Sequence, residues 1–167
     1  DFVLGFESRT EAEQFRRGLE ERLSRFNLEL HADKTRLIEF GRFAATNRAR
    51  RGEGKPETFD FLGLTHICGR SRRGAFVVVR QTVHKRMRAK LREVKEKLRQ
   101  RMHETVPEQG RWLASVLRGH YQYYGVSLNG RALASFRSGV IRHWKRTLER
   151  RSQKARVTWQ RMWRLVK

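Results

Sequence analysis

The apolar residues that follow position 82 recur at helical spacing through nearly all of the second half of the chain. Steps of three and four residues place the members of each stripe on one face of a helix. The stripes are Val83, Met87, Leu91, Val94, Leu98 and Met102; then Trp112, Leu113, Val116, Leu117, Tyr121 and Tyr124; then Leu133, Phe136, Val140, Trp144 and Leu148. Such stripes are buried only against one another, so residues 83–167 are predicted to form a helical bundle.

The ends of these helices are also marked in the sequence. The second helix is expected to follow Pro107, and Asn129-Gly130 is expected to end it. Thr158 can cap a short last helix that holds Trp159, Met162, Trp163 and Val166. The bundle therefore has three or four helices, with residues 150–156 as a basic connector before the last one.

Residues 1–82 show a mixed pattern. Ser8 followed by Glu11 predicts a capped helix, with Phe15, Leu19, Leu23 and Phe26 on one of its faces. Short apolar or alternating runs predict strands, and stretches rich in polar residues and glycine predict loops. The predicted strands are 2–6, 28–30, 35–40, 59–64 and 75–79, the exposed loop is 44–57, and the hairpin loop, with three Arg, is Gly69–Gly74. The expected fold class is α+β, with a few antiparallel strands and one helix before the bundle.

The net positive charge of the chain lies entirely after residue 60. Residues 1–60 hold 12 Lys or Arg and 12 Asp or Glu, whereas residues 61–167 hold 27 against 5, which accounts for the whole net charge of +22. Between Lys85 and Arg101 there are nine basic residues and two Glu. A block of one sign usually marks a surface that meets a polyanion, and nucleic acid is the expected partner. The alternative is a basic surface that is merely solvated.

Several other kinds of protein do not fit the composition. No segment approaches the roughly 20 apolar residues of a membrane span, so no membrane partner is expected. Cys68 is the single cysteine, which excludes an intramolecular disulfide and a zinc site made of cysteines alone. The chain opens on the apolar run from Phe2 to Phe6, so we expect it to be the downstream part of a longer protein.

Five short elements, in this order, resemble the C-terminal part of bacterial group II intron reverse transcriptase/maturases. In that family a Tyr-Ala-Asp-Asp motif is followed by Phe-Val, and a Lys-Thr pair, a Phe-x-Phe-Leu-Gly segment, a Gly-x-x-x-Tyr-Tyr element and an Arg-Arg-Ser-Gln-Lys connector come later. The matching segments are Asp1 to Phe6, Asp33 to Arg42, Phe59 to Leu64, Gly119 to Tyr124, and Arg150 to Lys154 with Thr158-Trp159. The resemblance runs from end to end.

The resemblance implies two parts. Residues 1–82 would be the end of a reverse-transcriptase palm with its primer-grip hairpin, and residues 83–167 the thumb, or maturase domain X. The parent protein would be an RNA-directed DNA polymerase of a mobile element that also assists RNA splicing. Its partners would be intron RNA, template–primer and the missing fingers and upstream palm, and its location the bacterial cytoplasm, in association with nucleic acid.

The resemblance and the basic patches together assign candidate site residues. Asp1 would be the one catalytic, Mg²⁺-binding carboxylate present, and a single carboxylate cannot organise two metal ions, so the chain alone is expected to be inactive in polymerisation. The candidates near primer or nucleotide are Lys34, Phe61, Leu62 and Gly63. The candidates for RNA binding are Lys85, Arg86, Arg88, Lys90, Arg92, Lys95, Arg118, His120, Tyr124, Arg150, Arg151, Lys154 and Arg156.

Two other functions remain open from the sequence. The first is a non-catalytic RNA-binding maturase module that stabilises folded intron RNA. The second is a degenerate gene piece without activity. Of Tyr121, Tyr123 and Tyr124, which cannot all face one way on a helix, two are expected to pack and one to be free to stack or hydrogen-bond.

Overall fold

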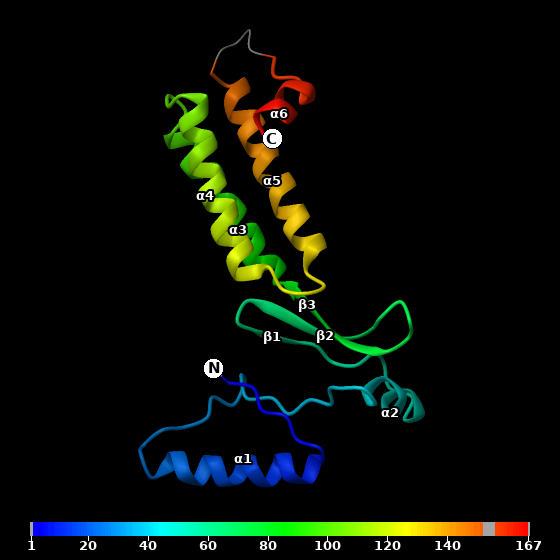
Figure 1. Ribbon diagram of the computed structural model, residues 1–167. Coiled ribbons are helices and arrows are strands. Elements are labelled where there is room, and N and C mark those ends of the chain that lie inside the picture. The colour runs from blue at the N-terminus through cyan, green and yellow to red at the C-terminus, as the bar shows by residue number, and fades with distance from the viewer. Residues whose placement is uncertain (1, 152–155, 167) are drawn as a thin grey trace. The chain divides into compact units, whose positions relative to one another are not determined.

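The computed structural model of the chain describes residues 2–151 and 156–166 (Figure 1). These residues form six helices and one three-stranded sheet, so the predicted α+β class is confirmed. The helices are α1 (Arg9–Ser24), α2 (Ala44–Arg50), α3 (His84–Gln100), α4 (Val106–Tyr124), α5 (Gly130–Glu149) and α6 (Trp159–Leu165), and the strands are β1 (Phe59–Phe61), β2 (Leu64–Arg70) and β3 (Phe76–Thr82).

The chain divides into two compact units. The first comprises Asp1–Phe61 and Ile67–Val78, and the second Leu62–His66 and Val79–Lys167. Strands β2 and β3 contribute residues to both units, whereas the division predicted between residues 82 and 83 separates two continuous stretches. We refer to them below as the first unit and the helical unit.

The sheet has the strand order β1-β2-β3. Leu62 and Gly63 alone connect β1 to β2, and residues 71–75 connect β2 to β3, so both pairs are antiparallel hairpins. In the second hairpin the Ser71 N–H donates to the Ala75 carbonyl oxygen at 2.8 Å. This confirms a hairpin in the predicted place, although β2 extends to Arg70, so the loop is shorter than the predicted Gly69–Gly74. The strand predicted over 59–64 is two strands joined by a turn.

Three of the predicted strands are wrong. Residues 2–6, 28–30 and 35–40 are not in strands, and the side chains of Phe2 and Leu28 are more than half exposed. A strand persists only where a neighbour accepts and donates its backbone hydrogen bonds. Within the part of the chain that the structure describes, β1, β2 and β3 are the only segments paired in this way.

The loop predicted for residues 44–57 is also partly wrong, because α2 occupies its first half. Its seven residues include three alanines and two arginines, which favour helix, and Gly52 with a φ of 69° follows it. The Asn47 side-chain amide and the Arg51 guanidinium both donate to Glu39, at 2.9 and 2.5 Å. These contacts to Glu39, which lies outside the helix, add to the helix preference of its own residues.

Helix α1 begins as predicted, because the Ser8 hydroxyl accepts from the Glu11 N–H at 3.2 Å. Its apolar face is not buried: Phe15 is 44% exposed, and its ring contacts Phe6 with centroids 5.3 Å apart. Among the described residues of the first unit, Ala12 and Ala44 are the only buried apolar ones. The first unit therefore has little core of its own.

The helical unit has a continuous core, and the three predicted stripes are confirmed. Helices α3, α4 and α5 run alongside one another in Figure 1, and α6 adds Met162, which has no exposed surface. The buried members of the core are Val94, Leu98, Leu113, Phe136, Val140, Ile141, Trp144, Leu148, Val157 and Met162. Gly139 allows α5 to approach α3 closely, since a Cβ there would lie 2.8 Å from Leu91 Cδ2.

Helix α4 is bounded by side-chain chemistry at its start. Thr105 and Glu108 form a reciprocal capping box, and Pro107 lies in the first turn. The helix ends at Tyr124, so the prediction that Asn129-Gly130 ends it is wrong. Asn129 instead precedes α5, and its side chain is committed to tertiary hydrogen bonds.

Candidate nucleic-acid interface

The β1–β2 turn is formed by two residues with positive φ, 48° at Leu62 and 78° at Gly63, as type I′ hairpin turns require. The Gly63 carbonyl oxygen accepts from the Val83 N–H at 3.0 Å, which joins the turn to the start of α3. Tyr123 donates its hydroxyl to the Leu62 carbonyl oxygen at 3.1 Å. Leu62 itself is 62% exposed, so the turn presents an apolar side chain on a backbone fixed from two sides.

Gly63 is required at this turn for a second reason. A Cβ at this position would lie 3.0 Å from the Tyr124 hydroxyl oxygen and 3.1 Å from Arg86 Nη1. The structure thus brings together four residues predicted separately from two parts of the sequence: Leu62, Gly63, Arg86 and Tyr124. With Tyr123 they are called the turn cluster below.

Asn129 joins the segments that carry the turn cluster. From the sequence it was predicted only to break a helix. Its side chain is 1% exposed, and its oxygen accepts from the Thr82 N–H at 2.9 Å. Its amide donates to Thr82 Oγ1 at 2.9 Å and to the Tyr124 carbonyl oxygen at 2.8 Å. Asn129 therefore ties the end of β3 to the end of α4, on which the turn cluster depends. An Asn before Gly carries no local signal for such a role.

The basic residues of α3 differ along the helix in how they are paired. In its C-terminal half Lys97 and Arg99 form ion pairs with Glu93 and Glu96, at 2.9 and 3.4 Å. Lys90 also pairs with Glu93, at 2.9 Å, and hydrogen bonds from Lys97 and Lys90 lower the pKa of Glu93. Within the described part of the chain, no ion pair involves the remaining candidates, all of them exposed. These are Lys85, Arg86, Arg88, Arg92 and Lys95.

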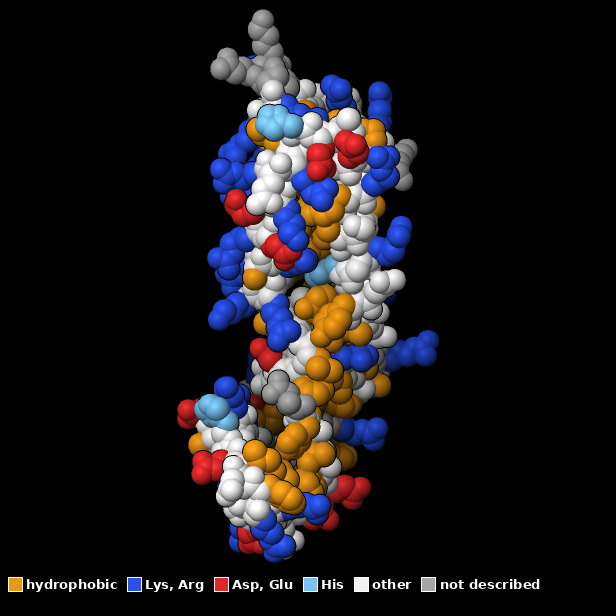
Figure 2. Space-filling model, turned by 90° about the vertical axis from the view of Figure 1, so that its left-hand side faces the viewer, with side chains coloured by type: hydrophobic (Ala, Val, Ile, Leu, Met, Phe, Trp, Pro, Cys, Tyr) orange, Lys and Arg blue, Asp and Glu red, His pale blue; other side chains and the backbone are white. Residues whose placement is uncertain are grey.

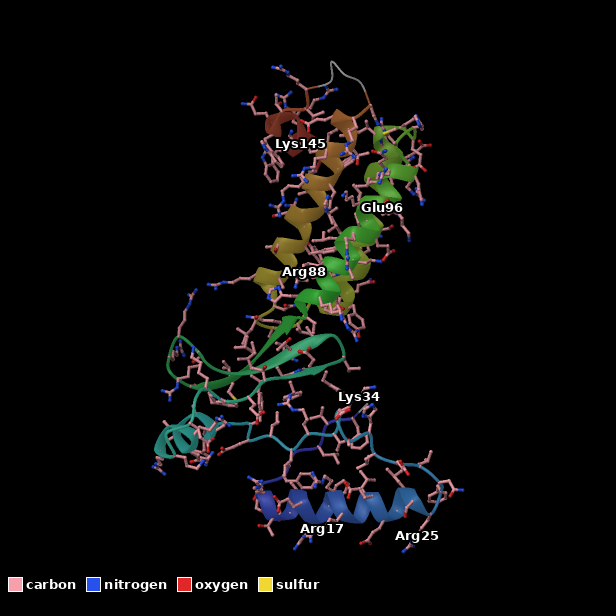
Figure 3. The ribbon with its side chains drawn as sticks, turned by 180° about the vertical axis from the view of Figure 1, so that it is seen from behind. Arg17, Arg25, Lys34, Arg88, Glu96 and Lys145 are labelled. Carbon is pink, nitrogen blue, oxygen red and sulfur yellow. The ribbon has the colours of Figure 1, made fainter. Side chains whose placement is uncertain are left out.

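Four of these unpaired bases form a single stripe. Lys85, Arg88, Arg92 and Lys95 follow at steps of three, four and three residues, so they share one face of α3. Figure 3 labels Arg88 on this part of α3 and Glu96 farther along the helix. This stripe is called the α3 basic stripe below.

The α3 basic stripe continues toward positive charge on α5. Burial lowers the pKa of His143, and so do the charges of Arg146, Lys95 and Arg142. Bases from both helices therefore disfavour a proton on the His143 ring. In Figure 2 Lys and Arg side chains stand out along the helical unit, with few acidic ones among them. A surface of this kind attracts phosphates.

His120 lies in the core and not on the basic surface. It is 7% exposed, and its ring stacks on Phe136 with centroids 3.7 Å apart. Burial, and then the charge of Lys90, lower its pKa to about 4. The prediction that His120 contacts RNA is not compatible with this position, because its side chain is covered. Helical spacing alone could not reveal this, since His120 sits between the apolar positions of α4.

The tyrosines of α4 divide as predicted. Tyr121 and Tyr124 are half-buried, and Tyr123 is 55% exposed. Tyr123 is also the one that donates a hydrogen bond to the turn, and its ring meets Tyr124 edge-on at 4.7 Å.

The remaining candidates are spread along the chain. Lys34 is exposed in the first unit (Figure 3), and Phe61 is half-buried there. Arg118, Arg150, Arg151 and Arg156 are exposed, and Arg151 donates to the Glu104 carbonyl oxygen. Asp1 and Lys154 lie outside the described residues.

The described residues do not make up a two-metal site. Among residues 2–151 and 156–166, no three His, Cys, Asp or Glu side chains lie close enough together to hold a metal ion. Mg²⁺ coordination by several carboxylates is what the implied polymerase chemistry requires.

Comparison of the chain with family models, with curated proteins and with solved structures gives no match. The resemblance to a known family therefore rests on the motifs of the sequence alone. None of the helices in the described part of the chain combines the length and apolar character needed to cross a bilayer.

Proposed function

We propose that this chain is the C-terminal part of a group II intron reverse transcriptase/maturase, and that it binds intron RNA and template–primer. In this proposal the first unit and the hairpins belong to the end of the palm, and α3–α6 to the thumb and domain X. The turn cluster would contact the primer, and the α3 basic stripe would contact phosphates. Such contacts position a nucleic acid without reading its sequence.

The turn cluster is the observation that carries this proposal. The Phe-x-Phe-Leu-Gly segment of the motif ends in a turn whose backbone is fixed by Tyr123 and by the start of α3. In this proposal a primer end packs against the exposed side chain of Leu62, which the turn holds in a fixed place. Arg86 lies beside it and forms no ion pair among the described residues.

The second candidate is a non-catalytic maturase module. The helical unit supports this second candidate, because the unit has its own core and carries unpaired bases on one helix. A protein that stabilises a folded RNA needs contacts to the RNA backbone, but it does not need to bind a nucleotide substrate. Binding of a template–primer duplex distinguishes the two candidates, because this chain alone is expected to be inactive in polymerisation under either. Affinity for the duplex comparable to that for intron RNA supports the first candidate, and binding of intron RNA alone supports the module.

Removal of two unpaired charges tests the binding surface. The variant Arg88→Gln with Arg92→Gln is compared with Lys97→Gln and Arg99→Gln, which removes the same charge from ion-paired positions on the same helix. Binding to a structured intron RNA is measured by filter retention over a range of salt. We expect the first variant to bind about tenfold more weakly and to lower the slope of log K against log salt by about 2.

The control variant should lose less than about threefold, because its bases are already neutralised by Glu93 and Glu96. Equal losses in both variants would contradict the α3 basic stripe as the contact surface. Weak parental binding that is flat with salt would contradict phosphate contacts altogether.

A further inference from the structure

The β2–β3 hairpin carries a group of arginines that the proposed function leaves without a role. Arg70 ends β2, and Arg72 and Arg73 lie in the loop, where all three are exposed. The loop is closed by its own backbone: the Ser71 N–H donates to Ala75, and the Gly74 N–H donates to the Ser71 carbonyl oxygen at 3.0 Å. Gly74 has a φ of 79°, which completes the tight turn. The guanidinium groups therefore extend from a fixed backbone.

The hairpin arginines account for the net positive charge of the first unit. Residues 1–60 have balanced charge, and five of their arginines form ion pairs: Arg9, Arg16, Arg36, Arg48 and Arg51. Arg42, Arg70, Arg72 and Arg73 form none within the described part of the chain. The hairpin thus concentrates the excess charge of the first unit at one place.

A groove lies between this hairpin and the segment that precedes α2. It measures about 480 Å³ and is lined by Gly41, Arg42, Cys68, Gly69, Arg70 and Gly74, among others. The Gly41 N–H donates to Cys68 Sγ at 3.4 Å, which holds the segment against β2. Three of the lining residues are glycines, so backbone edges are accessible, and an arginine comes from each side. We call it the hairpin groove.

We infer that the hairpin groove binds the phosphodiester backbone of a nucleic acid, as a contact separate from the α3 basic stripe. Guanidinium groups bind phosphate oxygens in pairs, and they do so best where no carboxylate competes. The groove offers such groups from two segments of the chain, with room for a strand between them. This inference rests on the proposal that the chain binds RNA, and it adds a second surface to it.

Cys68 allows a direct test, because it is the only thiol in the chain and it lines the groove. The rate of its alkylation by a small maleimide is measured on the full chain, with and without saturating intron RNA. We expect bound RNA to slow alkylation at least about fivefold, and high salt, about 1 M, to restore the rate as the complex dissociates. The alkylation rate of Cys68 is also measured with anionic lipid vesicles in place of the RNA.

Two triple variants separate a local contact from general electrostatics. Arg70→Gln, Arg72→Gln and Arg73→Gln remove the hairpin charge. Arg17→Gln, Arg22→Gln and Arg25→Gln remove the same charge from exposed positions at or just after α1 that also lack ion pairs (Figure 3). We expect the hairpin variant to lose at least about tenfold in RNA affinity and most of the protection of Cys68. The α1 variant should keep both within about threefold.

The outcomes distinguish this inference from the proposed function. RNA that binds the chain but leaves the alkylation rate unchanged overturns the hairpin groove and leaves the α3 basic stripe intact. RNA that does not bind at all overturns the proposed function. If Cys68 does not react in the free chain, the RNA affinities of the two triple variants test the inference instead. Equal losses of affinity in the two variants overturn it. Protection by vesicles but not by RNA would also overturn it.

Discussion

The pH dependence of the stability of the helical unit is set by single residues, above all His120. The His120 ring is covered by Phe136 from α5 and by Tyr124 from its own helix, and its Nε2 has no hydrogen-bond partner among the described residues. Lys90 of α3 adds a positive charge nearby. A proton on this ring would be unpaired in an apolar setting, which is why its pKa falls from 6.5 to about 4.

We therefore expect the helical unit to lose stability on mild acidification. Between pH 6.5 and 4 the unfolded chain binds a proton at His120 that the folded chain does not, so the free energy of unfolding falls as the pH falls. His143, whose pKa is also lowered, acts in the same direction. From pH 7 to pH 5 the expected loss from His120 alone is about 1–2 kcal/mol, measured by urea unfolding with tryptophan fluorescence.

The variant His120→Phe keeps the stack on Phe136 and cannot take up a proton, so it should flatten the pH dependence. The same change at the exposed His103 is the control and should leave the dependence as in the parent chain. A parental stability that is constant from pH 7 to 5 would show that His120 is not held neutral by burial.

At the scale of the element, close contact between helices limits the size of the side chain that a position can hold. Gly139 faces Leu91 across the α3–α5 contact, with no room for a Cβ, whereas a Cβ at Gly119 on the exposed side of α4 would meet no atom within 4 Å. Gly139→Val is expected to lower the free energy of unfolding by about 2 kcal/mol through overpacking, and Gly119→Val to change it by less than about 0.5 kcal/mol. Urea denaturation measures both.

Equal effects of these two substitutions would mean that helix propensity and not packing sets the cost. A small effect at Gly139 alone would mean that the Leu91 side chain moves aside without loss of contact.

The elements also differ in how well they could be predicted. A helix satisfies its own hydrogen bonds, so the stripes of α3, α4 and α5 were sufficient to place them. A strand needs a neighbour, and residues 2–6, 28–30 and 35–40 have none among the described residues. Helix α2 was missed because its stabilising contacts, from Asn47 and Arg51 to Glu39, are tertiary.

For the whole molecule, the net charge of +22 opposes compaction. The helical unit holds few acids with which its bases can pair, so self-repulsion persists where Arg86, Arg88 and Arg92 lie unpaired. We expect its melting temperature to rise by several degrees as NaCl increases from about 0.05 to about 0.5 M, because screening weakens this repulsion over distances beyond the Debye length.

The chain contains convenient reporters for this measurement. All four tryptophans, Trp112, Trp144, Trp159 and Trp163, belong to the helical unit, so their fluorescence follows that unit alone. A melting temperature that falls with salt would show that the ion pairs, such as Lys97–Glu93, outweigh the repulsion. An uncharged osmolyte at matched osmotic strength serves as the control.

The sequence by itself determined the helices other than α2, the place of the hairpin loop and the basic character of the second half, because helical periodicity and charge are local properties that need no partner. It also supplied the motifs on which the proposed function rests. Only the tertiary structure decided which candidates share a site. It placed Leu62 and Gly63 with Arg86 and Tyr124, buried His120, and gave Asn129 its role. Each of these depends on contacts between residues distant in the chain, and no spacing along a single element contains that information.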